Sequence, residues 1–305
     1  MLNFDGRVAI VTGAGRGLGR SHALALAERG ARVVVNDLGG AVDGTGASSD
    51  AAAEVVSQIE EAGGEAIANG ANVTSFDQVQ SMVDEAHEKW GSVDVLVNNA
   101  GILRDKSFNN MELSDFQTVV DVHLMGSVNA TKAVWPIMRE QNYGRIVMTT
   151  SSSGLYGNFG QANYGAAKTS VVGLMNTLHL EGAKYNIRVN CLSPAAATRM
   201  LEGLIPYAMA GLLNTDAVAA GLVYLVSEDG PSRTILSAGA GTFAVARIYE
   251  TAGVSLLPDE VTPEGVAAHW DEIAATDGQA ELQMGSQQTE KFVIKAADKL
   301  GLSLG

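Results

Sequence analysis

The chain has 305 residues, a hydrophobic content of 46% and a formal net charge of −14. This length and composition suit one large α/β domain, or one domain with an appended segment. The acidic charge disfavours binding to nucleic acids and anionic membranes, so a phosphate-bearing ligand would need a locally built site. The single cysteine, Cys191, excludes an internal disulfide and a cysteine-based zinc site. We expect it to be a buried small hydrophobe, and we expect no bound metal.

The start of the chain and its apolar runs predict a soluble, cytoplasmic protein. The segment 1–13 has no charged-then-apolar leader and enters a predicted strand directly. No apolar run reaches the roughly 20 residues that cross a bilayer. The lone cysteine also fits a reducing compartment.

Short, uninterrupted, β-branched apolar runs indicate strands that are buried on both faces, as in parallel sheets. The predicted strands are Val8–Val11, Val33–Val35, Val93–Val97, Ile146–Met148 and Ile187–Leu192, with Glu65–Ala68 as a weaker candidate. Amphipathic helical patterns alternate with them at Leu18–Arg29, Asp50–Ala62, Ser75–Trp90, Glu112–Gln141 and Ala162–Tyr185. This alternation predicts an α/β fold with right-handed βαβ units in a doubly wound, Rossmann-type parallel sheet.

Two stretches interrupt this rhythm. Leu38–Ser49 is rich in glycine and serine and is predicted to be a surface loop. Residues 195–213 are mostly apolar but contain Pro206, and we expect a lid with short helices there. The pattern changes after about Ala246, so we divide the chain into a dinucleotide-binding domain, residues 1–250, and a C-terminal extension, residues 251–305.

A glycine-rich turn follows the first predicted strand and opens the first predicted helix. Glycine permits positive φ angles and lets backbone N–H groups approach a pyrophosphate, while the helix N-terminus adds free donors. An isolated glycine string would be weak evidence, but the strand–turn–helix context favours a dinucleotide site over an ordinary turn. The residues assigned to cofactor binding here are Gly13, Gly15, Arg16, Gly17, Leu18 and Gly19.

Asp37 ends the second predicted strand, about 20 residues beyond the glycines. A carboxylate at this place accepts hydrogen bonds from the adenosine ribose hydroxyls and repels a 2′-phosphate, so Asp37 favours NAD over NADP. The alternative is an aspartate that merely caps a helix or a turn. Arg16 argues in the other direction, because a basic residue in the glycine turn can accommodate a 2′-phosphate.

Several motifs in the same order resemble the short-chain dehydrogenase/reductase superfamily over about residues 5–245. They are Thr12–Gly19 (TGAGRGLG), Asn98–Gly101 (NNAG) and Tyr164–Lys168 (YGAAK), with Ser151 thirteen positions upstream of Tyr164. The resemblance implies an oxidoreductase that interconverts a secondary alcohol and a ketone. It further implies cofactor contacts from Asn72, Val73, Asn99, Ala100, Gly101, Tyr164, Lys168 and Thr198.

Tyr164 and Lys168 lie four positions apart in a predicted helix, so both project from one face. A nearby ammonium and a positively charged nicotinamide would favour the phenolate and lower the phenol pKa from its usual value near 10. Tyr164 would then act as general base toward an alcohol, and as acid in the reverse direction. Ser151 is expected to hold the substrate oxygen, although only the family spacing selects it over Ser152 and Ser153.

A closer resemblance is to the dehydrogenase part of peroxisomal multifunctional enzymes type 2. It rests on Asn36–Gly40 (NDLGG), Asn98–Asp105 (NNAGILRD), Val122–Leu124 (VHL) and Ser153–Lys168. It implies a (3R)-hydroxyacyl-CoA dehydrogenase of fatty-acid β-oxidation. Most of the superfamily has asparagine where this chain has His123, but the subgroup shares the histidine, and we include His123 in the catalytic set.

The chain also departs from that subgroup. It ends at Gly305, without hydratase or sterol-carrier parts, and Leu302–Gly305 is no peroxisomal address. These features lead us to expect a bacterial stand-alone homologue in the cytoplasm. Broad helical faces predict a homodimer or homotetramer.

The substrate remains open between an acyl-CoA and a steroid or other lipophilic alcohol, since an apolar lid suits either. Arg104, Lys106 and Arg199 are candidates to meet a CoA phosphate, or are simply solvated charges. An alternative of another class is a non-catalytic dinucleotide-binding protein, against which the intact Ser151, Tyr164 and Lys168 argue.

Overall fold

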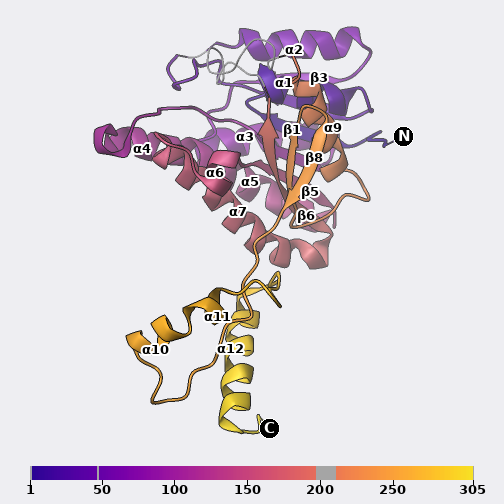
Figure 1. Ribbon diagram of the computed structural model, residues 1–305. Coiled ribbons are helices and arrows are strands. Elements are labelled where there is room, and N and C mark those ends of the chain that lie inside the picture. The colour runs from indigo at the N-terminus through magenta and orange to yellow at the C-terminus, as the bar shows by residue number, and fades with distance from the viewer. Residues whose placement is uncertain (1, 47, 197–210, 305) are drawn as a thin grey trace. The chain divides into compact units, whose positions relative to one another are not determined.

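The structure, a computed structural model, describes residues 2–46, 48–196 and 211–304. The chain divides into two compact units, Met1–Val245 and Ala246–Gly305. The first unit contains the predicted sheet and its helices, and the second contains the C-terminal extension (Figure 1). The boundary coincides with the change in sequence pattern near Ala246 and lies five residues before the domain limit drawn at residue 250.

An eight-stranded sheet forms the centre of the first unit, with the strand order β3-β2-β1-β4-β5-β6-β7-β8. Every pair from β3 to β7 is parallel. The strands are β1 (Val8–Thr12), β2 (Arg32–Asn36), β3 (Ala66–Asn69), β4 (Val95–Asn98), β5 (Gly144–Thr149), β6 (Ile187–Ala195), β7 (Ile235–Gly239) and β8 (Thr242–Ala246). The predicted Rossmann-type doubly wound sheet is confirmed. Its strand order reverses between β1 and β4, where such sheets bind ligands.

The β-branched composition of the central strands follows from their burial on both faces. All five residues of β1 and all four of β4 are buried. Each fully buried valine or isoleucine contributes about 2 kcal/mol from the removal of apolar surface from water. The register of β1 with β2 pairs Thr12 with Asn36 at the carboxyl ends of both strands, which places the glycine turn beside Asp37.

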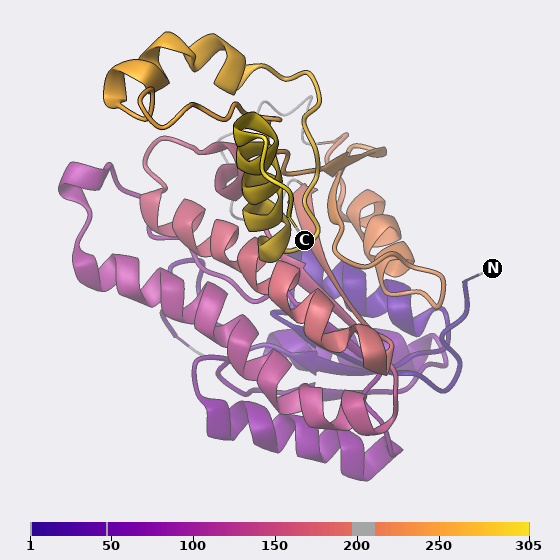
Figure 2. The same cartoon turned by 90° about the horizontal axis from the view of Figure 1, so that it is seen from below.

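Helices cover both faces of the sheet. On one face α3, α5 and α7 run side by side, and α1, α2 and α9 lie on the other (Figure 2). The larger helices are α1 (Gly17–Ala27), α2 (Asp50–Glu61), α3 (Phe76–Trp90), α5 (Gly126–Glu140), α7 (Ala162–Gly182) and α9 (Thr215–Leu225). A short helix, α6 (Ser152–Tyr156), follows β5 directly.

The stretch Glu112–Gln141, predicted as one helix, has a wider turn in its middle. The observed elements are α4 (Leu113–Val120), a π-helical turn η2 (Asp121–Met125) and α5. Such π-turns insert one extra residue into the helical ladder and occur frequently at functional sites. This turn places His123 in the interior, with a side chain that is almost fully buried.

The amino-terminal end of the central strand β5 contains a fully buried arginine, Arg145. Its guanidinium lies 4.2 Å from the Tyr143 ring centroid. It donates hydrogen bonds to four backbone carbonyl oxygens, those of Gly144, Asn186, Ser227 and Glu228. Arg145 therefore joins β5 to the start of β6 and to the segment after α9.

The described part of the second unit has two short helices, one helix of 16 residues and few buried side chains. Its helices are α10 (Pro263–Ala268), α11 (Trp270–Ala274) and α12 (Gly285–Leu300). Thr262 caps α10 by accepting a hydrogen bond from the Gly265 N–H at 3.0 Å. An ion pair joins Arg247 to Glu281 at 2.8 Å, and the Lys291 ammonium binds the Glu250 carboxylate. Among the described residues of both units, no helix is long and apolar enough to cross a membrane.

We expect Arg145→Leu to lower the free energy of unfolding by about 3 kcal/mol, because four carbonyl oxygens lose a buried cationic donor. Arg139→Leu is the matched control, since Arg139 is exposed and bonds the Tyr185 hydroxyl at the surface. This control should change stability by less than about 1 kcal/mol. Urea unfolding midpoints at equal m-values measure both effects. Equal midpoints for the two variants would contradict the assigned role of Arg145.

Candidate active site

The glycine turn between β1 and α1 is held so tightly that side chains would not fit. Gly13 has φ = +63°, and a Cβ there would lie 2.8 Å from the Ala100 Cα. A Cβ on Gly19 would lie 2.1 Å from the Gly13 carbonyl oxygen. Helix α1 begins at Gly17 without a side-chain cap at Arg16, so its first backbone N–H groups are available to a ligand.

Thr12 and Asn99 fasten this turn to the end of β4. The Thr12 hydroxyl oxygen accepts hydrogen bonds from the backbone N–H groups of Asn99 and Ala100, at 3.0 and 3.1 Å. The Asn99 side-chain amide donates to the carbonyl oxygens of Thr12 and Gly13, both at 3.0 Å. Sequence analysis missed this function of Thr12. It assigned Asn99 a ribose contact, which stays a prediction, while the structure shows its amide nitrogen holding the turn.

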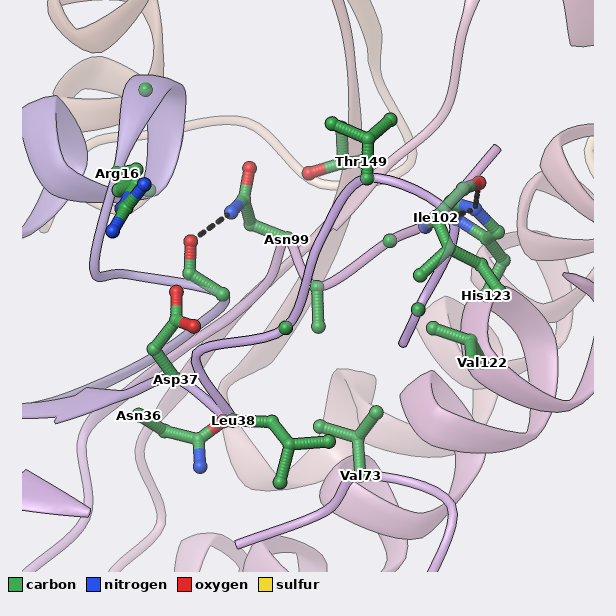
Figure 3. Close-up of a pocket in the computed structure, with 18 of the residues that line it drawn as sticks. Arg16, Asn36, Asp37, Leu38, Val73, Asn99, Ile102, Val122, His123 and Thr149 are labelled. Atoms are coloured by element: carbon green, nitrogen blue, oxygen red, sulfur yellow. Dashed lines mark hydrogen bonds between the residues drawn. The ribbon is translucent and has the colours of Figure 1, made fainter. Parts of the chain in front are cut away.

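The Asp37 carboxylate lies beside the glycine turn, as predicted. One oxygen accepts a hydrogen bond from the Gly15 N–H at 2.8 Å, and the other accepts one from the Gly39 N–H at 2.6 Å. A carboxylate offers about four acceptor positions, so two remain for the hydroxyls of a ribose. In Figure 3, Asp37 lies between Asn36 and the glycine turn, near Leu38.

The cavity between these elements has a volume of about 380 Å³. All candidate site residues that the structure describes line it, with the exceptions of Gly15 and Ser151. Asn72 and Val73 line it after β3, where the Asn72 side-chain oxygen accepts bonds from the Thr74 N–H and hydroxyl. Residues of the loop after Asp37 line it too, which the sequence did not indicate.

Tyr164 and Lys168 meet at the other end of the cavity, on one face of α7. The Lys168 ammonium is buried and donates a hydrogen bond to the Thr149 carbonyl oxygen at 2.6 Å. It lies 5.6 Å from the centroid of the Tyr164 ring. Burial lowers the pKa of Lys168 to about 7.

Ser151 is the N-cap residue of α6, where the chain leaves β5. Its hydroxyl oxygen accepts a hydrogen bond from the Ser153 N–H at 3.2 Å. A hydrogen bond with Ser151 lowers the pKa of Tyr164, but burial acts more strongly, so the pKa of Tyr164 is raised overall. The sequence argument expected the neighbouring ammonium to lower this pKa. Among the protein's own groups desolvation prevails instead.

His123 contributes a neutral imidazole to the same end of the cavity. Its ring meets the Tyr164 ring edge-on, with centroids 5.1 Å apart. Nε2 lies 3.1 Å from the Ile102 nitrogen and 2.8 Å from the Ile102 oxygen, and Nδ1 is buried without a partner among the described residues. Burial, aided by the charge of Lys168, holds the pKa of His123 well below its usual range. A Cβ on Gly101 would lie 2.3 Å from the ring, so only glycine fits beneath it.

Two sets of predicted ligand contacts stay predictions. Thr198, Arg199 and most of the predicted lid fall within 197–210 and lie outside the described residues. Arg104 and Lys106, candidates to meet a CoA phosphate, both bind the Asp115 carboxylate, at 3.0 and 3.2 Å. The two cations share this one carboxylate.

No group of histidine, cysteine or acidic side chains within the described ranges is arranged to hold a metal ion. The fold and the cavity are those of a dinucleotide-binding enzyme, and Tyr164 and Lys168 line the end of the cavity away from the glycine turn. Comparison with known proteins supports this class. The family profile described as short chain dehydrogenase matches residues 7–205, and the chain belongs to this family.

The chain is similar to proteins from bacteria and animals. It is 47% identical over 280 residues to a short-chain type dehydrogenase/reductase of Mycobacterium tuberculosis, covering 91% of this chain and 97% of the relative. It is 44% identical over 307 residues to the peroxisomal multifunctional enzyme type 2 of Mus musculus, covering 99% of this chain. It spans 41% of that mouse enzyme and 30% of a similar peroxisomal hydratase-dehydrogenase-epimerase of Saccharomyces cerevisiae.

The chain is also similar to solved structures of related dehydrogenases. The full-length multifunctional enzyme type 2 of Drosophila melanogaster has a TM-score of 0.82 at 38% identity, covering 98% of this chain and 51% of that chain. A 7α-hydroxysteroid dehydrogenase in complex with NADH has a TM-score of 0.71 at 30% identity, covering 78% and 95%. The family and the latter structure indicate a nicotinamide dinucleotide as cofactor.

We expect Gly19→Ala to weaken NADH binding at least about tenfold, because the new Cβ displaces the Gly13 carbonyl and distorts the turn. Gly173→Ala is the control, since a Cβ on this glycine of α7 meets nothing within 4 Å. NADH fluorescence titration measures the affinity, and the far-UV circular dichroism spectrum shows that each variant is folded. Parent-like affinity in a folded Gly19→Ala variant would contradict the assignment of the turn.

Proposed function

We propose that this chain is an NAD-dependent dehydrogenase that interconverts (3R)-3-hydroxyacyl-CoA and 3-oxoacyl-CoA thioesters. The observation that carries the proposal is the meeting of Tyr164 and Lys168 at the end of a dinucleotide cavity, with Ser151 near enough to Tyr164 to lower its pKa. A phenol, a hydroxyl and an ammonium gathered there suit proton transfer to and from a substrate oxygen. The bound nicotinamide would accept or donate the hydride.

Each of the three side chains has a distinct task in this reaction. The Ser151 hydroxyl binds the substrate oxygen and holds it beside Tyr164. In the oxidation direction the Tyr164 phenolate takes the hydroxyl proton, and in the reduction direction the phenol returns it. Lys168, fixed by the Thr149 carbonyl oxygen, presents its remaining N–H donors to the nicotinamide ribose.

The raised pKa of Tyr164 bears on the pH dependence of the two directions. A phenol with a raised pKa is protonated at neutral pH and ready to act as the acid in ketone reduction. Oxidation requires the phenolate, whose fraction increases with pH. The positive charge of an oxidised nicotinamide would favour that phenolate.

His123 supports Tyr164 rather than exchanging protons itself. A lowered pKa keeps the imidazole neutral at the pH where a dehydrogenase works. A neutral ring adds no second cation beside Lys168, and its edge-on contact restrains the Tyr164 ring. We therefore assign His123 a positioning role within the predicted catalytic set.

The choice of NAD rests on Asp37. Its carboxylate keeps two acceptor positions for the ribose hydroxyls, and its charge repels a 2′-phosphate. Arg16 also lines the cavity and acts in the opposite direction, since a basic side chain there can accommodate a 2′-phosphate.

The substrate class rests on the relatives. Their names include a multifunctional enzyme type 2, a hydratase-dehydrogenase-epimerase and a 3-oxoacyl-[acyl-carrier-protein] reductase of Synechocystis. The last name describes a 3-oxoacyl thioester, the chemical group that our proposal places at Ser151 and Tyr164. The hydroxysteroid dehydrogenase similarity makes a steroid the second candidate substrate.

We also propose that the enzyme works in the cytoplasm as a homodimer or homotetramer. The buried, free Cys191 fits a reducing compartment. The long helices α5 and α7 offer broad faces for a second copy.

We expect the protein to reduce 3-oxoacyl-CoA thioesters with NADH near pH 7 and to oxidise (3R)-3-hydroxyacyl-CoA faster at pH 9 than at pH 7, because oxidation needs the phenolate. Tyr164→Phe should lower kcat by about a thousandfold in both directions. A panel of thioesters of several chain lengths and hydroxysteroids, assayed by NADH absorbance, measures this. Turnover of steroids alone would replace the thioester proposal, and an unchanged kcat in Tyr164→Phe would refute the catalytic assignment.

We expect Asp37→Ser to lower the preference for NAD over NADP, as a ratio of kcat/KM values, by at least about tenfold, because the charge that repels a 2′-phosphate is removed. Asp50→Ser, at an exposed position in the first turn of α2, should leave the ratio unchanged. Both cofactors are assayed with the same enzyme preparation. An unfolded fraction of the enzyme then lowers both kcat/KM values equally and leaves their ratio unchanged. An unchanged ratio in Asp37→Ser would show that another group selects the cofactor.

A further inference from the structure

The loop after Asp37 forms one wall of the cofactor cavity. We name residues 38–46 the strap, and five of them line the cavity: Leu38, Gly40, Ala41, Val42 and Gly44. Other walls come from the glycine turn and from Asn99–Ile102. A dinucleotide in this cavity therefore lies against the strap along part of its length.

Two hydrogen bonds latch the strap to the segment that follows β4. The Leu103 N–H donates to the Val42 carbonyl oxygen at 2.9 Å. The Arg104 Nε–H donates to the Asp43 carbonyl oxygen at 3.1 Å. The first bond is between backbone groups, so Arg104 supplies the side-chain part of this latch.

The Arg104 guanidinium is itself held from the far side. Its Nη1 lies 3.0 Å from a carboxylate oxygen of Asp115 and 3.4 Å from the Thr118 hydroxyl, both on α4. The side chain is about a quarter exposed, so solvent competes only partly for these bonds. Arg104 thus bridges the strap to a helix of the main body.

The strap is folded on itself by backbone hydrogen bonds. The Ala41 N–H donates to the Thr45 carbonyl oxygen at 2.7 Å, and the Gly44 N–H donates to the Ala41 oxygen at 3.0 Å. At its base the Ser48 N–H donates to the Leu38 carbonyl oxygen at 3.0 Å. None of these bonds belongs to the latch, so opening of the latch would leave them in place.

We propose that Arg104 is a positioning residue that latches the strap against bound dinucleotide, so that opening of this latch governs how fast the dinucleotide leaves. The inference rests on the dinucleotide part of the proposed function and is independent of the thioester substrate. It gives Arg104 a function other than binding a CoA phosphate, in agreement with its bonds to Asp43 and Asp115.

Lys106 provides a matched control for Arg104. It binds the other carboxylate oxygen of Asp115, at 3.2 Å, and is about half exposed. Lys106 belongs to the same charge cluster, but no hydrogen bond or ion pair of the described residues joins it to the strap. Replacing either cation leaves the other one paired with Asp115, so Asp115 stays compensated in both variants.

NADH dissociation tests the proposal directly. Each enzyme is loaded with NADH, mixed rapidly with excess ADP-ribose, and followed by NADH fluorescence. Arg104→Met should release NADH about tenfold faster than the parent, the value of one hydrogen bond from a charged donor. Lys106→Met should stay within about twofold of the parent, as an exposed ion pair contributes little. An unchanged rate in Arg104→Met, or equal acceleration in both variants, would overturn the latch.

Hydrogen exchange without dinucleotide provides a readout that separates the latch from the proposed function. Arg104→Met should exchange the amides of the strap and of Leu103 faster than the parent, while Lys106→Met should not. Faster NADH release without faster strap exchange would also overturn the proposal. Failure of the parent to bind NADH at all would instead refute the dinucleotide function, whatever the strap does.

Discussion

The reactive end of the cavity depends on one buried ammonium, that of Lys168. Removing a cation from water is costly, and the protein offsets the cost with the Thr149 carbonyl oxygen at the end of β5. The burial lowers the pKa of Lys168 to about 7, so its protonation responds to whatever binds beside it. Neighbouring groups are correspondingly neutral. Burial raises the pKa of the Cys191 thiol to about 12, and His123 is kept uncharged by burial and by Lys168 itself.

The other end of the cavity depends on close backbone approach instead of charge. Thr12 and Asn99 take part in five hydrogen bonds that bring the ends of β1 and β4 together, and glycines occupy the places where a Cβ would collide. These contacts are possible because the strand order reverses between β1 and β4. The fold thus builds a closely packed glycine turn at one end of the cavity and a desolvated pair, Tyr164 and Lys168, at the other.

The sequence predicted the features that depend on local patterns. The apolar runs located six strands, and the glycine turn and Tyr164–Lys168 were placed where the structure has them. No strand was predicted at β7 or β8, and no helix at α9. Helix α9 was missed because Thr215–Leu225 is apolar nearly throughout and shows little amphipathic period.

Features that depend on distant partners were also missed. The π-turn that buries His123, the Asn99 contacts with β1 and the raised pKa of Tyr164 each arise from residues far apart in the chain. The glycine-rich stretch predicted only a surface loop, whereas its backbone carbonyl oxygens are bound by Leu103 and Arg104. Tertiary context therefore decides what these local patterns become.

Asp37 links cofactor recognition to the strap. One of its carboxylate oxygens bonds the Gly15 N–H in the glycine turn and the other bonds the Gly39 N–H at the start of the strap. A ribose bound at this carboxylate would therefore touch the joint between the turn and the strap. Arg104 and Leu103 hold the middle of the strap, at Asp43 and Val42. A ribose at Asp37 and the latch would therefore act on the same short segment. Asp37, on which the proposed preference for NAD rests, is thus also the anchor from which this cavity wall extends.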